Sequence, residues 1–182
     1  MGSEPFGAML AGGHPNSLGR TVEVVECVLD DPARLDELLA CYGSGDDVVR
    51  LRTSNALKRI GAERHDWLVP CIPFLLTHVA ALDQPSAQWT LAQLFDRLSG
   101  DMSAEQRAAA EAILRRNLSE AGDWIVLNTT MDTLASWAIT VPAGVDPTLR
   151  DWLAPHLDRL AGDARKSVAK RAAGHRARLA AD

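Results

Sequence analysis

Apolar residues recur at helical spacing along this chain from about Thr21 onward. Between the apolar stretches lie short segments rich in Gly, Pro, Asp and Ser, the residues that end helices and form turns. These segments read "DDP", "GSGDD", "LDQPS", "LSGDMS", "EAGD", "VPAGVDP" and "AGD". No run of β-branched and aromatic residues alternates with polar ones, as a half-buried strand would require. The pattern predicts an all-α protein made of many short helices.

Several of the predicted helix ends carry their own capping residues. Ser103 and Gln106 have the spacing of a reciprocal capping box, in which each side chain accepts a hydrogen bond from the other residue's backbone N–H. Asp46 and Asp123 are expected to accept hydrogen bonds from the free N–H groups of the helices that follow them.

Three of the predicted helices carry their apolar residues in the same phase. At offsets +4, +7, +8 and +11 from Val49, Ala87 and Val126 the residues are apolar or small, and these offsets form one stripe along a helix. The stripe residues are Thr53, Ala56, Leu57 and Ile60; Leu91, Leu94, Phe95 and Leu98; and Thr130, Thr133, Leu134 and Trp137. The starts are 38 and 39 residues apart. This period predicts a helical repeat, because a helix pair that cannot bury its own apolar face stacks on another copy.

A fourth copy begins at Val168, and a second set of helices lies between the copies. The fourth stripe holds Ala172, His175, Arg176 and Leu179, so it turns polar as a terminal repeat with one solvated side should. Two helices of the second set share the pattern D-W-L-x-P, at residues 66–70 and 151–155. The chain is therefore expected to form about four helix pairs in a single domain over residues 21–182.

Residues 1–20 differ from the rest of the chain. They are rich in Gly and Pro and lack a periodic apolar pattern, so we expect a flexible N-terminal arm. The alternative is that part of this segment packs as a short helix.

The segment "DDVVRLRTSNAL", residues 46–57, resembles the second helix of HEAT repeats, D-x-x-V-R-x-x-A-x-x-A-L, with Thr53 in place of the usual Ala. Residues 123–134 are a weaker copy that lacks the Arg. The resemblance implies an α-α superhelix of the HEAT or ARM-like type, in which outer and inner helices alternate and the inner helices line a concave surface. It also implies bends in the outer helices, where Pro73 and Pro155 lie. A regular Arg ladder is not expected, because Gln88, Leu127 and Ala169 stand where Arg50 would recur.

The face opposite the apolar stripe is the candidate recognition surface. Offsets +2 and +6 on the three inner helices place a tryptophan beside neutral amides, a composition typical of binding surfaces. The predicted partner-binding residues are Leu51, Asn55, Trp89, Gln93, Asn128 and Asp132. The alternative for Trp89 is packing beneath a neighbouring helix, and the other tryptophans, including Trp124, are expected to be structural. The leading hypothesis is a non-enzymatic module that binds an unidentified protein or peptide through its concave inner-helix face.

The distribution of charge supports a second hypothesis. The chain has 19 Lys+Arg and 24 Asp+Glu, a formal net charge of -5, so it is not a polycation that coats nucleic acid. Residues 163–182 are an exception, and the basic patch Arg165, Lys166, Lys170 and Arg171 has the chemistry to grip phosphates. Some HEAT-like proteins are alkylpurine DNA glycosylases, so nucleic-acid binding or DNA repair is the alternative function. A solvated capping helix with a basic last turn, which suits the helix dipole, is the simpler explanation.

Signatures of other site classes are missing from the sequence. The three cysteines form no C-x-x-C, the five histidines form no H-E-x-x-H, and no G-x-S-x-G occurs, so no metal, cofactor or catalytic residue is predicted. Acid–base catalysis by outward carboxylates such as Asp96 and Asp132 stays open, whereas a chaperone for a cofactor-bearing protein has no residue-level support. The odd cysteine count and the lack of a secretion signal or of an apolar run of about 18 residues predict a cytoplasmic protein without a membrane contact.

Overall fold

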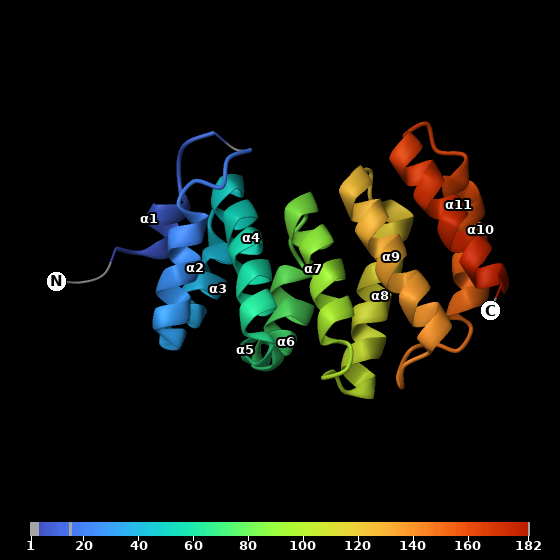
Figure 1. Cartoon of the computed structure of the whole chain (residues 1–182), viewed down its shortest axis with the longest axis horizontal. Helices are drawn as coiled ribbons and strands as arrows, with labels where there is room; N and C mark the ends of the chain where they lie inside the picture. Colours follow the sequence, from blue (N-terminus) through green and yellow to red (C-terminus); the bar gives the residue numbers. More distant parts are fainter. Residues whose placement is uncertain (1–3, 15, 182) are drawn as a thin grey trace. The chain divides into compact units, whose positions relative to one another are not determined.

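The computed structural model describes residues 4–14 and 16–181, and every regular element in this part of the chain is a helix (Figure 1). The predicted all-α class is confirmed. The chain divides into two compact units, Met1–Pro70 and Cys71–Asp182, where the sequence suggested one domain from residue 21 onward. Among the described helices, none combines the length and the apolar character that crossing a bilayer requires.

The first unit is built around helix α4. Its α-helices are α1 (Phe6–Leu10), α2 (Thr21–Asp30), α3 (Leu35–Ala40), α4 (Asp47–Glu63) and α5 (His65–Leu68), with 3₁₀ turns η1 (Pro32–Arg34) and η2 (Cys41–Gly43). Helices α1, α2 and α3 all pack on α4. Asp46 caps α4 as predicted, because its Oδ1 accepts a 2.8 Å hydrogen bond from the Val48 N–H.

The buried side chain of Arg52 holds the loop between α1 and α2 on the first unit. This side chain is only 1% exposed, and its guanidinium donates hydrogen bonds of 2.6–3.3 Å to five backbone carbonyls and to Ser17 Oγ. The carbonyls belong to Leu10, Ala11, Gly12, His14 and Ser17. The first carbonyl belongs to the last residue of α1 and the other four to the loop that follows it, so a single cation holds several points of this segment.

The N-terminal segment takes the alternative that the sequence left open, a short packed helix. Helix α1 buries Phe6, Met9 and Leu10, whose i, i+3, i+4 spacing gives one apolar face. The Phe6 N–H donates a 2.7 Å hydrogen bond to Glu37 Oε1, and the Arg34 guanidinium lies 3.8 Å from the centre of the Phe6 ring. Residues 1–3 and 15 of the predicted arm lie outside the described residues.

The second unit consists of stacked helix pairs. Its α-helices are α6 (Ile72–Phe74), α7 (Pro85–Leu98), α8 (Ala104–Glu120), α9 (Trp124–Thr140), α10 (Leu149–Ala161) and α11 (Lys166–Ala181). A 3₁₀ turn η3 (Val69–Cys71) and a π-helical turn η4 (Leu75–Val79) flank α6, so the helix is irregular around Pro73, whereas α10 continues through Pro155. The Ser103–Gln106 capping box at the start of α8 and the Asp123 cap of α9 are both present, as predicted.

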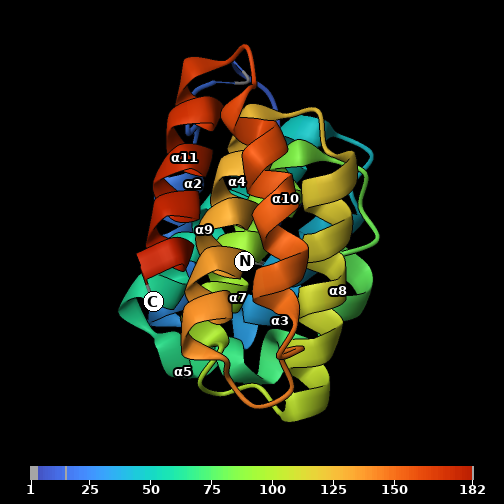
Figure 2. The same cartoon turned by 90° about the vertical axis from the view of Figure 1, so that its right-hand side faces the viewer.

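Helices α7, α9 and α11 run parallel, with α8 and α10 as the return helices between them. Short connections join α7 to α8, α8 to α9 and α10 to α11, and α9 packs against all four of the other long helices of the unit (Figure 2). The Thr133 hydroxyl donates a 2.9 Å hydrogen bond to the carbonyl of Ala92, which links α9 to α7. Arg165, just before α11, donates to the carbonyl of Gly122, just before α9, so these two helices begin at the same end.

The predicted in-phase stripe is the buried face of all four repeated helices. Each of its members on α4, α7 and α9 is buried, in the first unit for α4 and in the second for α7 and α9. On α11, Val168, Ala172, His175 and Leu179 are buried, and Arg176 is half-buried. The expectation that the later part of the fourth stripe would be solvated is wrong at His175, which is 9% exposed because it packs against α9.

Candidate functional site

An open pocket of about 500 Å³ lies between α9 and α11 in the second unit. We call it the α9–α11 pocket. It is lined by Asp132 of α9 and by six residues of α11, which are Ser167, Lys170, Arg171, Gly174, His175 and Arg178. The six α11 positions follow the spacing i, i+3, i+4, i+7, i+8 and i+11, which is one face of a helix. Its side chains carry three fixed positive charges, one carboxylate and one imidazole.

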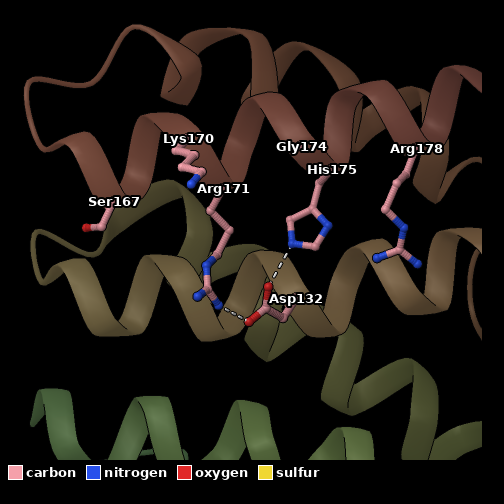
Figure 3. Close-up of a pocket in the computed structure, with 7 residues that line it drawn as sticks. All are labelled: Asp132, Ser167, Lys170, Arg171, Gly174, His175 and Arg178. Atoms are coloured by element: carbon pink, nitrogen blue, oxygen red, sulfur yellow. Dashed lines mark hydrogen bonds and ion pairs between the residues drawn. The ribbon is translucent and has the colours of Figure 1, made fainter.

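Asp132 joins the two walls of the pocket. Its Oδ1 lies 2.7 Å from His175 Nε2, and its Oδ2 accepts a hydrogen bond from Arg171 Nη1. Figure 3 shows both side chains reaching from α11 down to the single carboxylate on α9. The Asp132 and Arg171 side chains are 43% and 44% exposed, so water reaches this ion pair. An exposed pair of this kind typically contributes 0 to about 1 kcal/mol to stability, and it therefore exchanges partners at little cost.

Lys170 and Arg178 flank the Asp132 contacts without partners of their own. Both are exposed, and neither has a hydrogen bond or an ion pair within the described part of the chain. By contrast, Arg176 does not line the pocket, and it forms an ion pair with Asp158 of α10 at 3.0 Å. The pocket therefore keeps two cations available to a negatively charged ligand.

Gly174 keeps the α11 wall of the pocket open. It lies in the interior of the helix, where a Cβ added to it would meet no heavy atom within 4 Å. Glycine in a helix interior costs about 1 kcal/mol relative to alanine. Between Arg171 and Arg178 the pocket wall therefore carries the side chain of His175 alone.

Asp96 on α7 feels the charge of Asp132. Partial burial raises the pKa of the Asp96 carboxyl above its ordinary value, and repulsion from the Asp132 carboxylate raises this pKa further. The surface beside the pocket is therefore acidic on its α7 side and basic on its α11 side. Within the pocket, a ligand with negative charge is favoured on the α11 side.

The predicted partner-binding residues are distributed over both units. Asp132 lines the pocket, Gln93 is exposed on α7 and Trp89 is half-buried on α7. Leu51 and Asn55 are half-buried on α4, in the first unit. Asn128 was expected on the outward face, and this expectation is wrong because the structure buries the residue to 4% exposure. Asp132, four residues further along the same face of α9, is 43% exposed, so this face is covered at Asn128 and open at Asp132.

In the predicted basic patch, the two arginines form ion pairs with carboxylates, and the two lysines are exposed. Arg165 makes a bidentate contact with Asp163, with distances of 2.8 and 2.7 Å, and this contact lowers the pKa of the Asp163 carboxyl to about 2. Arg171 is held by Asp132, whereas Lys166 and Lys170 are exposed. Only Lys170 and Arg171 of the predicted patch line the pocket.

The exposure of Trp124 and the contact of His175 with Asp132 were not predicted from the sequence. Trp124, expected to be structural, is 49% exposed at the first position of α9. It precedes Asp132 by eight residues, which places it within about 80° of Asp132 around the helix axis. His175 was counted as part of a solvated stripe. The sequence signal for its contact with α9 was its position at offset +7 of the repeat. At the same offset on α9, Thr133 donates a hydrogen bond to the preceding repeated helix, α7.

In the described ranges, no three His, Cys, Asp or Glu side chains come together as metal ligands. Comparison of the chain with protein-family models, curated proteins and solved structures finds no significant match.

Proposed function

We propose that this protein is a non-enzymatic helical-repeat module that binds a segment of a partner protein across α9 and α11. The observation that carries the proposal is the α9–α11 pocket, in which Lys170 and Arg178 have no partner among the described residues and the ion pair of Asp132 with Arg171 is open to water. Its volume of about 500 Å³ lies within the usual range for ligand pockets. An open pocket of that size accommodates one or two side chains of an extended segment.

Two tryptophans supply the apolar part of this recognition surface: Trp124 is exposed and Trp89 is half-buried. Trp124 lies about two turns before Asp132 on α9, and Trp89 lies two turns before Asp96 on the parallel helix α7. Tryptophan is enriched among the residues that dominate binding energy, because its large rigid surface is buried at low entropic cost. A partner segment that lies along α9 would therefore contact the aromatic side chain near the start of α9 and the charged pocket about two turns further on.

We also propose that the helix pairs form a HEAT-like superhelix. Support comes from the common phase of the buried stripes on α4, α7, α9 and α11 and from the parallel course of α7, α9 and α11. The match of residues 46–57 to the HEAT second-helix signature adds to this support. In such a superhelix α7, α9 and α11 would be the inner helices and would present Trp89, Gln93 and Asp132 on the concave face.

The alternative function, binding of nucleic acid by the basic helix, is less favoured by the charges around the pocket. Arg165 and Arg171 are already paired with Asp163 and Asp132, and Asp96 adds a further acid on α7. A phosphate backbone crossing α9 would meet these carboxylates within a Debye length of about 8 Å at physiological salt. A protein segment needs only one negative charge beside α11, whereas a phosphate backbone carries a negative charge at every step.

The proposal is tested by selecting peptides from a random display library on the full-length protein and on two variants of one position. Gly174→Leu projects a large side chain into the pocket, whereas the matched control Gly174→Ala makes the same backbone change without filling it. Selected peptides should bind wild type and Gly174→Ala alike and lose affinity about tenfold or more in Gly174→Leu. Far-UV circular dichroism checks that both variants stay helical.

Two results would contradict the proposal. Selected peptides that bind Gly174→Leu as tightly as wild type do not use the α9–α11 pocket. A DNA duplex that binds with a steep salt dependence, when no peptide is selected, would move the function to nucleic acid.

A further inference from the structure

Asp132 occupies the donors that an external carboxylate would use. Arg171 Nη1 and His175 Nε2 each contact a different oxygen of the Asp132 side chain, so the two donors from α11 converge on one carboxylate. A carboxylate offers about four lone-pair sites on its two oxygens, and donors placed in this way recognise that group by shape as well as by charge. The pocket is therefore already matched to a carboxylate, and the carboxylate that it now holds belongs to the chain itself.

The internal contact is weakly held on its accessible side. Asp132 and Arg171 are each less than half covered, and exposed ion pairs contribute little to stability because water and salt screen them. Lys170 and Arg178 lie on the same face of α11 as Arg171 and have no partners of their own in the described part of the chain. With Gly174 leaving space between them, a second carboxylate has room to enter beside Asp132.

Entry of a second carboxylate brings it close to Asp132, and the two negative charges repel each other. The effect of Asp132 on a neighbouring acid is already visible at Asp96, whose pKa is raised by burial and by the Asp132 charge. An incoming acid must therefore either compete with Asp132 for Arg171 and His175 or remain at Lys170 and Arg178 alone. Competition uses all four donors of α11 and separates the two acids once Asp132 turns toward solvent.

We propose that the α9–α11 pocket binds the side chain of an Asp or Glu in the partner segment, and that Asp132 is an internal competitor which this side chain displaces from Arg171 and His175. The proposal rests on the proposed function, because it names the chemistry that the same pocket recognises. Asp132 then lowers the affinity of the pocket for acidic segments, because each must displace it. A segment without a carboxylate cannot displace Asp132 and does not bind in its place.

The competitor role predicts an opposite sign for two substitutions in the same pocket. Asp132→Asn removes the competing charge and should raise the affinity for an acidic peptide by up to about fivefold, the factor that corresponds to an exposed ion pair. Lys170→Ala removes a cation and should lower the affinity by a similar factor. A residue that merely contacted the ligand would lose affinity in both cases.

Each variant has a matched control. One control residue lies on α11, and the other lies on α10 and pairs with an arginine of α11. Asp158→Asn removes one negative charge from an arginine of α11, as Asp132→Asn does, but its partner Arg176 does not line the pocket. Lys166→Ala removes one exposed cation of α11 that likewise does not line the pocket. At 0.15 M salt, both controls should leave the affinity of the acidic peptide within about a factor of two.

The experiment measures fluorescence anisotropy of the tightest peptide from the library selection, together with variants in which each Asp or Glu becomes Asn or Gln. Loss of binding at one acidic position, with a gain in Asp132→Asn and no gain in Asp158→Asn, is the expected result. An equal gain in both variants would reduce the effect to net charge and would overturn the competitor role. Tighter binding of a phosphoserine at that position than of Glu would assign the pocket to phosphate.

Failure of this proposal is distinguishable from failure of the proposed function. Peptides that need an open pocket at Gly174, but carry no required acid or weaken in Asp132→Asn, refute the competitor while keeping the binding module. If no selected peptide depends on Gly174, both proposals fall.

Discussion

His175 Nε2 on α11 lies 2.7 Å from Asp132 Oδ1 on α9, although the two residues are 43 positions apart in the chain. Asp132 belongs to the outward set that the sequence predicted for partner binding, and His175 belongs to the basic terminal helix that supported the alternative function. Their contact brings one residue from each predicted region into one pocket. The choice between the two hypotheses therefore depends on the ligand that this one pocket accepts.

Gly174→Ala should stabilise the protein by about 1 kcal/mol, because alanine lowers the conformational freedom of the unfolded chain and its Cβ meets no atom within 4 Å. Urea denaturation followed by circular dichroism measures the change in the free energy of unfolding. The neighbouring exposed residue supplies the reverse control, since Ala173→Gly should destabilise α11 by a similar amount. A loss of stability in Gly174→Ala would mean that the space beside Gly174 is filled.

Arg52→Leu should destabilise the first unit by at least about 3 kcal/mol. The substitution leaves the carbonyls of Leu10 and Gly12 without their closest donors, and hydrogen bonds to a charged group are worth about 1.5–3 kcal/mol each. Thermal and urea unfolding report the loss, and hydrogen exchange should show faster exchange over residues 6–17.

The matched control for Arg52 is Arg59→Ala on the exposed face of the same helix, which should change stability by less than about 0.5 kcal/mol. Arg52→Lys should restore little, because an ammonium has three donors and cannot span the same carbonyls. Full stability in Arg52→Lys would show that charge alone, without the fork of the guanidinium, is sufficient.

Asp132→Asn should lower the pKa of Asp96 without returning it to its ordinary value. Burial is the larger cause of the raised pKa and stays in place, whereas the repulsion from Asp132 is removed. Because the folded state holds the Asp96 proton more tightly than the unfolded chain, the charge of Asp96 costs stability at neutral pH. That cost disappears as the pH falls through the raised pKa. NMR titration of the Asp carboxyl carbons measures the shift, and an unchanged Asp96 in Asp132→Asn would separate α7 from the pocket.

Ser103→Ala should cost about 1 kcal/mol by removing the cap of α8. Ser103 Oγ accepts a 3.1 Å hydrogen bond from the Gln106 N–H, and Gln106 Oε1 accepts a 2.8 Å hydrogen bond from the Ser103 N–H. Ser119→Ala near the exposed end of the same helix is the control and should be nearly neutral. Equal effects of the two substitutions on the melting temperature would show that the capping box contributes nothing.

The sequence was sufficient to predict the buried stripe but not the surface opposite it. A stripe depends on local spacing, so Thr53, Thr130 and Thr133 were assigned to the core despite their hydroxyl groups, and all three are buried. Exposure depends on how many helices surround a given helix, which spacing does not contain. Asn128 is therefore buried although Asp132 on the same face of α9 is 43% exposed, and Trp124 is exposed where α9 begins.

The pocket itself depends on contacts between residues about 40 positions apart. Nothing local to Asp132 indicates that Arg171 and His175 lie across from it, because that relation is set by the register between α9 and α11. The one sequence signal was the polar residue His175 at a core position of a repeated stripe. A polar residue in such a place is explained either by solvent or by a specific partner, and the structure has the partner.

The guanidinium of Arg52 also determines how short a fragment of this protein can be made. The apolar periodicity starts near Thr21, and a truncation designed from that pattern would discard every carbonyl that surrounds this buried charge. Such a fragment would lose the hydrogen-bond partners of Arg52 and the segment that covers its guanidinium, and it would expose the apolar residues of α2, α3 and α4 that pack against α1. An expression boundary or protease nick between Phe6 and Ser17 therefore removes contacts on which the first unit depends, and a fragment of this unit should begin at or before Phe6.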